Sequence, residues 1–307
     1  MKGLIEKLLI LGRIIFTGVF CGISVGVWAQ PDVSLKQELD GRIKDCRAQV
    51  GIALVLDGKD TLTFHNEVAY PLMSVYKLHQ ALAVGKYLHE RGETPEKRIS
   101  IGKEDLKPDT YSPLRDKYPD GNVSLSVREL LEYTLQWSDN NACDILFAHT
   151  GGTVGTDRYI HSLGLKEVEI LYTEDEMHQD LDKCYGNWSS PLEMARLLEM
   201  LFTVDLKMGD FQPLIRQILS TCRTGLKRLP KPLEGTEAQI AHKTGTGDRS
   251  AAGALIGIND AGVVFLPDGR RYTLVVFVKD SLESMEETEQ IIADVSEIVY
   301  RYVTGKR

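Results

Sequence analysis

Stretches with the periodicity of β-strands lie at both ends of the chain, and a long helical region lies between them. Residues 33–46 have a helical pattern, and two apolar runs at 50–56 and 61–64, joined by a turn at Asp57-Gly58, predict antiparallel strands. Strand signals return at 238–243, 251–258 and 272–278, before a last amphipathic helix at about 285–303. One sheet is therefore expected to take strands from both ends of the chain.

The middle of the chain predicts helices with clear start signals. Apolar residues predict a helix from Ser74 to Glu90 that stops at Gly92. Ser126 and Ser190 are each followed three residues later by a glutamate, which is typical of the first turn of a helix. The middle is therefore expected to form an all-helical region.

Together these elements predict an α/β fold with two lobes, in which an antiparallel sheet is flanked by helices and an all-α lobe packs beside it. The α/β lobe is expected at about 31–68 and 217–307 and the α lobe at about 69–216, within a single domain at 30–307. A groove between two such lobes is the usual place for a small-molecule site.

The first residues have the pattern of a signal peptide. Lys2, Lys7 and Arg13 are followed by an apolar run at 14–27, and small residues stand where a signal peptidase reads, which predicts cleavage after Ala29. The alternative is a retained anchor, but the uncharged run is shorter than the roughly 20 residues of a spanning helix. Residues 1–29 are therefore expected to direct export to the periplasm, with no membrane contact after cleavage.

Charge and cysteine content exclude several classes of partner. The net charge of −8 disfavours nucleic acid and anionic membrane surfaces. Four cysteines follow Ala29 without a Cys-x-x-Cys pair, so no metal site is expected, and their spacing leaves open whether they form disulfides. These are Cys46, Cys143, Cys184 and Cys222.

The strongest candidate for chemistry is Ser74-Val75-Tyr76-Lys77, at the start of an apolar helix. Positions three apart lie on one helical face, which brings the Ser74 hydroxyl within reach of the Lys77 amine. A serine hydroxyl needs an adjacent base to act as a nucleophile, and a desolvated lysine can supply one. The motif alone is weak evidence, because a capping serine and a solvated lysine can share this spacing.

Two further clusters strengthen the interpretation. Ser138-Asp139-Asn140 follows an apolar helix, and Lys243-Thr244-Gly245 ends a predicted strand. In this order and at these separations, the three motifs resemble those of the serine β-lactamases and penicillin-binding proteins. The resemblance covers nearly all of the chain after residue 29 and implies the two-lobed fold of that superfamily.

A polar segment from Tyr172 to His178 resembles the loop that carries a general-base glutamate in class A β-lactamases. Glu174 is assigned that role by its distance from Pro191, and Glu176 is the rival carboxylate. Tyr172, His178 and Asn187 depart from the residues usual in class A. These departures resemble the cephalosporinase and extended-spectrum branch, and they leave open how the loop is held.

The resemblance also implies catalytic roles. Ser74 would attack the lactam carbonyl, and either Lys77 or Glu174, through a water, would take its proton; the sequence leaves both open. Ser138 would pass a proton to the lactam nitrogen, with Lys243 polarising its hydroxyl. The backbone N–H groups of Ser74 and Thr246 would form the oxyanion hole.

Substrate contacts follow from the same resemblance. Asn140 would bind the substrate's side-chain amide, and the substrate carboxylate would meet the segment formed by Lys243, Thr244, Gly245 and Thr246. Three further residues are expected to contact or orient the substrate, and for each a purely structural role is the alternative: Tyr111, His178 and Arg228.

The expected function is hydrolysis of the β-lactam amide of penicillins and especially cephalosporins, which would give antibiotic resistance. No cofactor is expected, and the protein is expected to act as a monomer. Met73 stands where carbapenem-hydrolysing members have a cysteine, so specialised carbapenem turnover is not expected. The alternatives are a peptidoglycan DD-peptidase and a penicillin-sensing receptor domain; Glu174 argues against the first, and the lack of a long apolar run after residue 29 argues against the second.

Overall fold

The computed structural model describes residues 33–305. The expected signal peptide, residues 1–29 with cleavage after Ala29, lies outside the described residues. Within 33–305, no helix is long and apolar enough to cross a membrane.

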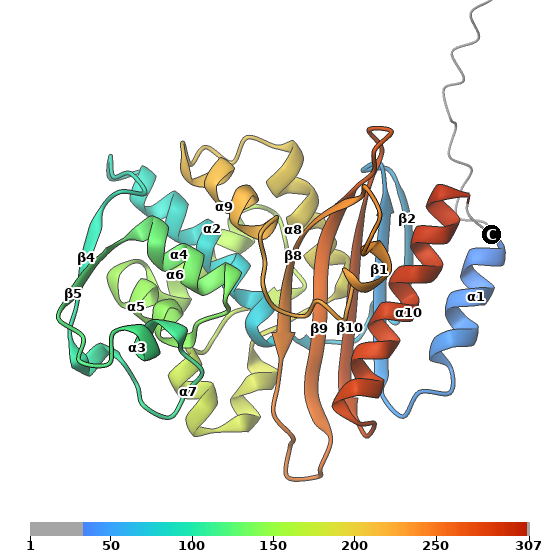
Figure 1. The fold of residues 1–307 in the computed structure, drawn as a ribbon, viewed down its shortest axis with the longest axis horizontal. Coiled ribbons are helices and arrows are strands. Elements are labelled where there is room, and N and C mark those ends of the chain that lie inside the picture. Colours follow the sequence, from blue (N-terminus) through green and yellow to red (C-terminus); the bar gives the residue numbers. More distant parts are fainter. Residues whose placement is uncertain (1–32, 306–307) are drawn as a thin grey trace, which may run out of the picture.

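A five-stranded antiparallel sheet forms the centre of the fold, in the order β2-β1-β10-β9-β8 (Figure 1). Its strands are β1 (Gln49–Leu56), β2 (Asp60–Phe64), β8 (Gln239–Thr246), β9 (Leu255–Phe265) and β10 (Arg271–Ser281). Because β1 pairs with β10, the expected joining of the two chain ends in one sheet is confirmed.

One strand prediction was displaced. The run expected at 251–258 begins only at Leu255 and continues to Phe265. The preceding residues form a turn around Gly253, whose φ is 79°. The sequence pattern did not predict the second half of this strand because it contains the polar pair Asn259 and Asp260. In the structure both side chains are buried and hydrogen-bonded.

Helices make up most of the chain between β2 and β8. They are α2 (Tyr76–His89), α3 (Pro113–Lys117), α4 (Val127–Gln136), α5 (Asn140–His149), α6 (Gly152–Ser162), α7 (Glu174–Gln179), α8 (Pro191–Thr203) and α9 (Phe211–Leu219). The 3₁₀ turns are η1 (Met73–Val75), η2 (Lys103–Asp105), η3 (Leu181–Gly186) and η4 (Lys231–Leu233). Short strands are β3 (Tyr70–Pro71), β4 (Arg98–Ile101), β5 (Val123–Ser126), β6 (Val168–Glu169) and β7 (Trp188–Ser189). Ser126 and Ser190 cap α4 and α8, as their sequence patterns predicted.

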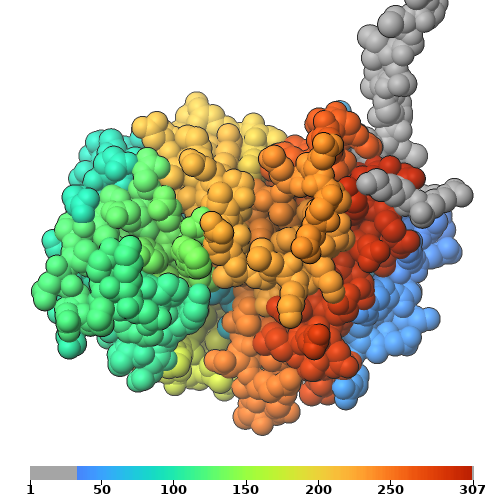
Figure 2. Space-filling model, in the orientation of Figure 1, coloured from blue at the N-terminus to red at the C-terminus, as the bar shows by residue number. Residues whose placement is uncertain are grey.

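Alternate residues of β1 belong to different hydrophobic cores. Ile52 and Leu54 pack in a core with α1 (Val33–Ile43) and α10 (Met285–Thr304), whereas Ala53 and Val55 belong to the core of the helical region. The strand is buried on both faces, which explains its continuous apolar sequence. Figure 2 shows the helical region and the sheet with its outer helices as adjoining parts of one surface. Helix α8 packs on β1 and β10 although it falls in the range expected for the α lobe, so the lobe boundaries stay a prediction.

The sheet fixes the segment that leads into η1. Asn259 of β9 donates its amide protons to the carbonyl oxygens of Pro71 (2.7 Å) and Leu72 (3.1 Å) and accepts from the Val278 N–H (3.2 Å). On β8, a Cβ at Gly245 would lie 2.4 Å from the Leu72 carbonyl oxygen. Only glycine lets this strand approach so closely.

We expect Asn259→Ala to lower the free energy of unfolding by about 2–3 kcal/mol, because it removes three buried hydrogen bonds, although the Leu72 carbonyl oxygen keeps the Val75 N–H as a donor. Urea denaturation would measure the change. Gln239→Ala, which removes an exposed amide from the same sheet, should change it by less than about 0.5 kcal/mol. Equal losses in the two variants would contradict the role given to Asn259.

Candidate active site

Ser74 lies in the 3₁₀ turn η1, at the wall of a cavity of about 360 Å³ between the helical region and β8. Met73, just before it, has a φ of 47°, a left-handed backbone conformation that residues other than glycine seldom adopt. Such strain is concentrated at functional sites. The cavity is lined by Met73, Ser74, Tyr111, Ser138, Asn140, Glu174, Met177, His178, Leu181, Cys184, Thr224, Thr244, Thr246 and Asp248.

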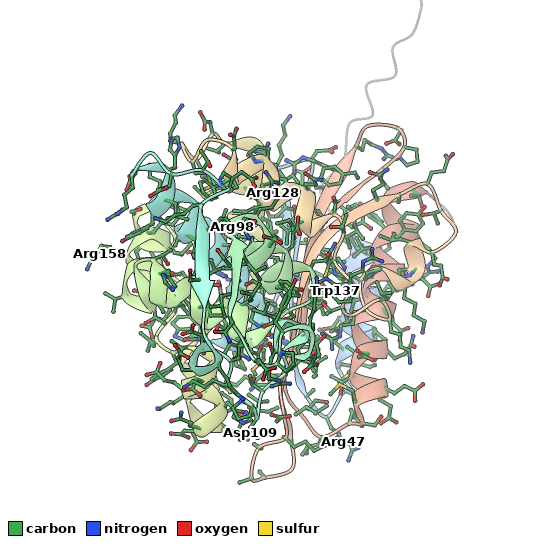
Figure 3. The ribbon with its side chains drawn as sticks, turned by 60° about the vertical axis from the view of Figure 1, so that its left-hand side comes forward. Arg47, Arg98, Asp109, Arg128, Trp137 and Arg158 are labelled. Carbon is green, nitrogen blue, oxygen red and sulfur yellow. The ribbon has the colours of Figure 1, made fainter. Side chains whose placement is uncertain are left out.

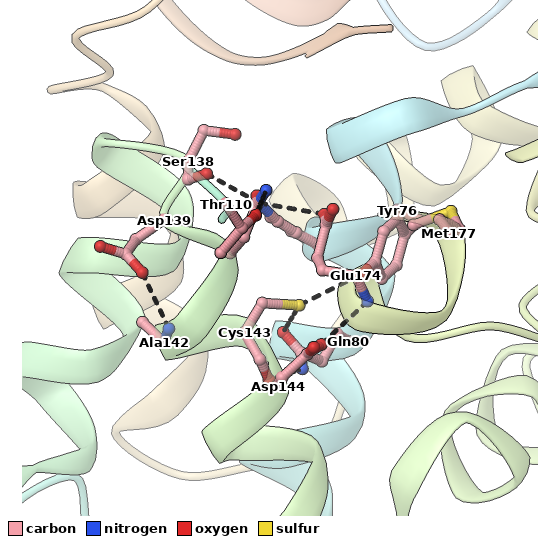
Figure 4. Close-up of polar contacts among 12 residues, drawn as sticks. Tyr76, Gln80, Thr110, Ser138, Asp139, Ala142, Cys143, Asp144, Glu174 and Met177 are labelled. Atoms are coloured by element: carbon pink, nitrogen blue, oxygen red, sulfur yellow. Dashed lines mark hydrogen bonds and ion pairs between the residues drawn. The ribbon is translucent and has the colours of Figure 1, made fainter. Parts of the chain in front are cut away.

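Lys77 is fully buried in the first turn of α2, beneath the cavity. Its Nζ donates to the Ser138 carbonyl oxygen (2.7 Å) and to Asn140 Oδ1 (2.6 Å), and it lies 3.1 Å from Glu174 Oε1 (Figure 4). Two separate segments, residues 138–140 and the start of α7, therefore supply three oxygen atoms to one ammonium group. A buried cation needs such partners, because burial without them is very costly.

Lys243 begins the β8 segment Lys243–Thr246, of which Thr244 and Thr246 line the cavity, and it is also fully buried. Its Nζ donates to Ser138 Oγ (2.9 Å) and to the Thr244 carbonyl oxygen (2.8 Å). Burial and the nearby charge of Lys77 lower the pKa of Lys243 to about 7. Ser138 has a φ of 61°, so a second strained residue presents its carbonyl oxygen to one lysine and its hydroxyl to the other.

The two candidate glutamates of the loop have different environments. Thr173 caps α7, and its N–H donates to Glu176 Oε2 (2.9 Å), so Glu176 is held in a capping box. Glu174 instead lines the cavity and pairs with Lys77. Its Oε1 accepts no hydrogen bond from the described residues. Of the two carboxylates, Glu174 is thus the one that faces the cavity and pairs with the buried lysine.

The sequence interpretation missed Asp144, one helical turn after Asn140 on α5. Its two carboxylate oxygens accept the backbone N–H groups of Glu174 (2.9 Å) and Asp175 (2.8 Å) and so fix the start of α7. Burial and the charge of Glu174 raise the pKa of Asp144 to about 7. An acid within the buried run Ala142–Phe147 was the signal that could have revealed it.

Asn187 holds together the two ends of the loop that carries Glu174. Its Oδ1 accepts the N–H groups of Leu171 (2.7 Å) and Tyr172 (2.9 Å), and its Nδ2 donates to the Tyr172 carbonyl oxygen (2.8 Å). A fully buried amide therefore joins the two ends of the loop without an ion pair. His178 is exposed on α7 and lines the cavity.

Arg228 is a buried residue, only 3% exposed, rather than a surface arginine. It does not line the cavity but lies behind β8, where its Nη2 donates to Thr246 Oγ1 (2.7 Å) and its Nη1 to the Gly245 carbonyl oxygen (3.0 Å). Thr224, which the sequence interpretation missed, lines the cavity with its Oγ1 2.5 Å from Thr244 Oγ1. Hydroxyl donors therefore line this side of the cavity, with cationic side chains buried behind them.

Tyr111 stands at the cavity rim and is 56% exposed. Its loop is fixed by Asp139, which accepts the Leu114 N–H (2.6 Å) and the Ser112 hydroxyl (2.9 Å) while capping α5. Trp137, just before Ser138, is a second exposed aromatic and is labelled in Figure 3. Asp139 therefore has a structural role between two cavity residues.

The four cysteines that follow Ala29 are all free thiols. Across residues 33–305 no group of His, Cys, Asp and Glu side chains is arranged to hold a metal ion. The chemistry available in the cavity is therefore that of a hydroxyl beside buried ammonium groups and a carboxylate, which suits acyl transfer through a covalent intermediate.

Comparison with known proteins agrees with this geometry. Residues 34–303 match the model of the beta-lactamase enzyme family. A β-lactamase of Bacteroides uniformis is 38% identical over 92% of this chain and 95% of its own, and the extended-spectrum β-lactamase PER-1 of Pseudomonas aeruginosa is 33% identical over 89% and 88%. The solved class A β-lactamase of Bacteroides cellulosilyticus superposes with a TM-score of 0.86, at 36% identity over 91% of this chain and 100% of its own. The chain therefore belongs to the beta-lactamase enzyme family, as a class A serine β-lactamase.

Proposed function

We propose that the protein hydrolyses the amide bond of penicillins and especially cephalosporins through an acyl-enzyme on Ser74, and so gives antibiotic resistance. The observation that carries the proposal is the Glu174 carboxylate 3.1 Å from the buried Lys77 ammonium, with Ser74 in the same cavity. A nucleophile alone would suit any member of the superfamily. A carboxylate beside it adds the means to release the acyl group.

Acylation begins with attack of Ser74 Oγ on the lactam carbonyl. Either Glu174, through a water, or Lys77, after it has given a proton to Glu174 and become a neutral amine, takes the serine proton. The N–H groups of Ser74 and Thr246 stabilise the oxyanion, and one such donor is typically worth about 10²–10³ in rate. Ser138 then gives its proton to the leaving nitrogen, since its oxygen accepts from Lys243 and its own proton remains available.

Deacylation needs a water activated beside the ester. Glu174 Oε1 pairs with Lys77 but accepts no hydrogen bond from residues 33–305, so it can accept one from that water. The cation of Lys77 stabilises the charged carboxylate. Asp144 positions Glu174 through the α7 backbone.

Recognition divides between two sides of the cavity. The substrate carboxylate lies against Thr244 and Thr246, with Lys243 and Arg228 supplying positive charge behind them. The substrate's side-chain amide binds Asn140, and Tyr111 and His178 bound the entrance. Similarity to an enzyme named as an extended-spectrum β-lactamase supports cephalosporins as substrates.

We also propose that residues 30–307 act as one monomeric domain in the periplasm after cleavage at Ala29. The basic and apolar pattern of residues 1–29 supports export. Proteolytic release and amino-terminal sequencing of the secreted protein would test the cleavage site.

A chromogenic cephalosporin tests the proposed function directly. Hydrolysis predicts many turnovers per enzyme, whereas a DD-peptidase would give one burst followed by slow release. Values of kcat/KM for penicillins, cephalosporins and carbapenems would then rank the substrates by discrimination in the transition state.

We expect Glu174→Gln to form the acyl-enzyme but release it slowly, because an amide cannot accept the water's proton. The adduct would accumulate as a mass increase on the intact protein, with turnover at least about 10²-fold slower. Glu176→Gln is the matched control, since glutamine preserves a capping box. Wild-type turnover by Glu174→Gln would remove Glu174 from its role.

Ser74→Ala should abolish both the adduct and turnover, because no hydroxyl remains to form the ester. Mass spectrometry after incubation with penicillin would measure the adduct, and circular dichroism would check folding. An adduct on this variant would identify a different nucleophile.

Asp144→Asn should slow deacylation by about 10-fold and acylation by less, because an amide has one acceptor oxygen for two backbone N–H groups. Single-turnover kinetics would separate the two steps. Gln179→Ala, which alters an exposed residue at the far end of α7, serves as the control. Equal slowing of both steps would show that Asp144 does not act through Glu174.

A further inference from the structure

A line of polar contacts runs from the interior of the sheet to the cavity wall. Asp260 Oδ1 lies 2.8 Å from His242 Nδ1, both residues are buried, and His242 lies close enough to the Cys222 thiol for each to shift the other's pKa. Cys222 Sγ lies 3.4 Å from Thr224 Oγ1, which lies 2.5 Å from Thr244 Oγ1. Thr224 and Thr244 line the cavity, so the line ends where the substrate carboxylate is proposed to bind.

The order of donors along this line depends on the sulfur. Each threonine hydroxyl has a single proton to donate. When Cys222 is a thiol, it can donate to Thr224, Thr224 can donate to Thr244, and Thr244 keeps its proton for the cavity. When Cys222 is a thiolate, it can only accept; Thr224 then donates to sulfur, Thr244 donates to Thr224, and only oxygen lone pairs face the cavity.

We propose that Cys222 is a positioning residue whose protonation sets the direction of the Thr224–Thr244 hydroxyl pair, and hence whether Thr244 can donate to a substrate carboxylate. The inference rests on the proposed hydrolysis of anionic β-lactams. Cys222 touches no reacting atom and acts only through the two hydroxyls. The Thr224 carbonyl oxygen is the other acceptor near the thiol, but at 3.9 Å it is farther than the hydroxyl.

The surroundings of Cys222 favour ionisation near neutral pH. Burial raises its pKa, but the charge and hydrogen bond of His242, with the charge of Lys243, outweigh that effect and lower the pKa to about 7. Burial lowers the pKa of His242, yet Asp260 and Cys222 together raise it to about 10. The imidazolium thus stays charged while the thiol titrates.

The groups that face the sulfur come from three segments. They are His242 and Lys243 of β8, Asp260 of β9 acting through His242, and Thr224 of the segment that carries Cys222. Lys243 also titrates near pH 7, and its loss of charge weakens anion binding in every variant. Only a comparison between variants therefore isolates Cys222.

The experiment measures KM and kcat for one anionic cephalosporin from about pH 6 to about pH 8.5 in wild type, Cys222→Ser and Thr224→Val. Between the lowest and highest pH, we expect KM of the wild type to rise about 10-fold more than KM of either variant. This factor corresponds to the loss of one hydrogen bond to a charged group. We expect kcat to change much less. Serine does not ionise in this range. The valine in Thr224→Val removes the hydroxyl that links Cys222 to Thr244, but it leaves the charge on the Cys222 sulfur unchanged.

Thr224→Val separates the hydroxyl chain from simple charge. If this variant keeps the wild-type KM profile while Cys222→Ser loses it, the sulfur acts only as a charge and the proposal is overturned. If all three profiles coincide, the proposal is also overturned, although hydrolysis itself would stand. Cys46→Ser, which alters a thiol next to α1, should keep the wild-type profile.

Thiolate absorbance in the ultraviolet gives a readout that does not need catalysis. The difference between wild type and Cys222→Ser should show a thiolate appearing near pH 7. Absence of that signal up to about pH 9, the range of an ordinary thiol, would overturn the proposal. Failure of the wild-type protein to hydrolyse any β-lactam would instead overturn the proposed function and leave this titration measurable.

Discussion

The buried ammonium of Lys77 is the interaction on which the active site depends. It contacts the Ser138 carbonyl oxygen and the Asn140 side chain, from the segment that leads into α5, and Glu174, from α7. A cation without solvent must be surrounded by oxygen atoms, so each of these segments is held at a fixed distance from α2. The same contacts that satisfy the charge therefore bring the proposed nucleophile, proton donor and base to one cavity.

The sheet provides a second, independent constraint. Asn259 and Gly245 act on the backbone rather than on the chemistry, since one binds the carbonyl oxygens before Ser74 and the other leaves room for β8 to lie against them. Ser74, the proposed nucleophile, is thus positioned by the sheet, and its proposed partners Lys77, Ser138 and Glu174 are positioned by the helical region. A site between the sheet and the helical region therefore requires the two parts to be packed against each other in a fixed arrangement.

The motifs and capped helices could be predicted because their signals are local. Ser126 and Ser190 have their hydrogen-bond partners three residues away, and Ser74 and Lys77 are themselves only three residues apart. Asp144 and Thr224 were missed because their partners are distant in sequence: Asp144 holds a backbone thirty residues away, and Thr224 meets Thr244 across the cavity wall. Nothing in the residues next to Thr224 distinguishes it from an ordinary hydroxyl, and the local signal at Asp144 is its place within the buried run Ala142–Phe147.

The close contact at Gly245 restricts where the cavity can change shape. A side chain there would collide with the Leu72 carbonyl oxygen, so the wall made by β8 cannot move or thicken without displacing Ser74. The opposite wall, made by α7 and the rim at Tyr111, carries exposed side chains. Adaptation to bulkier antibiotics is therefore physically easiest on that side, while the strand side stays invariant in shape.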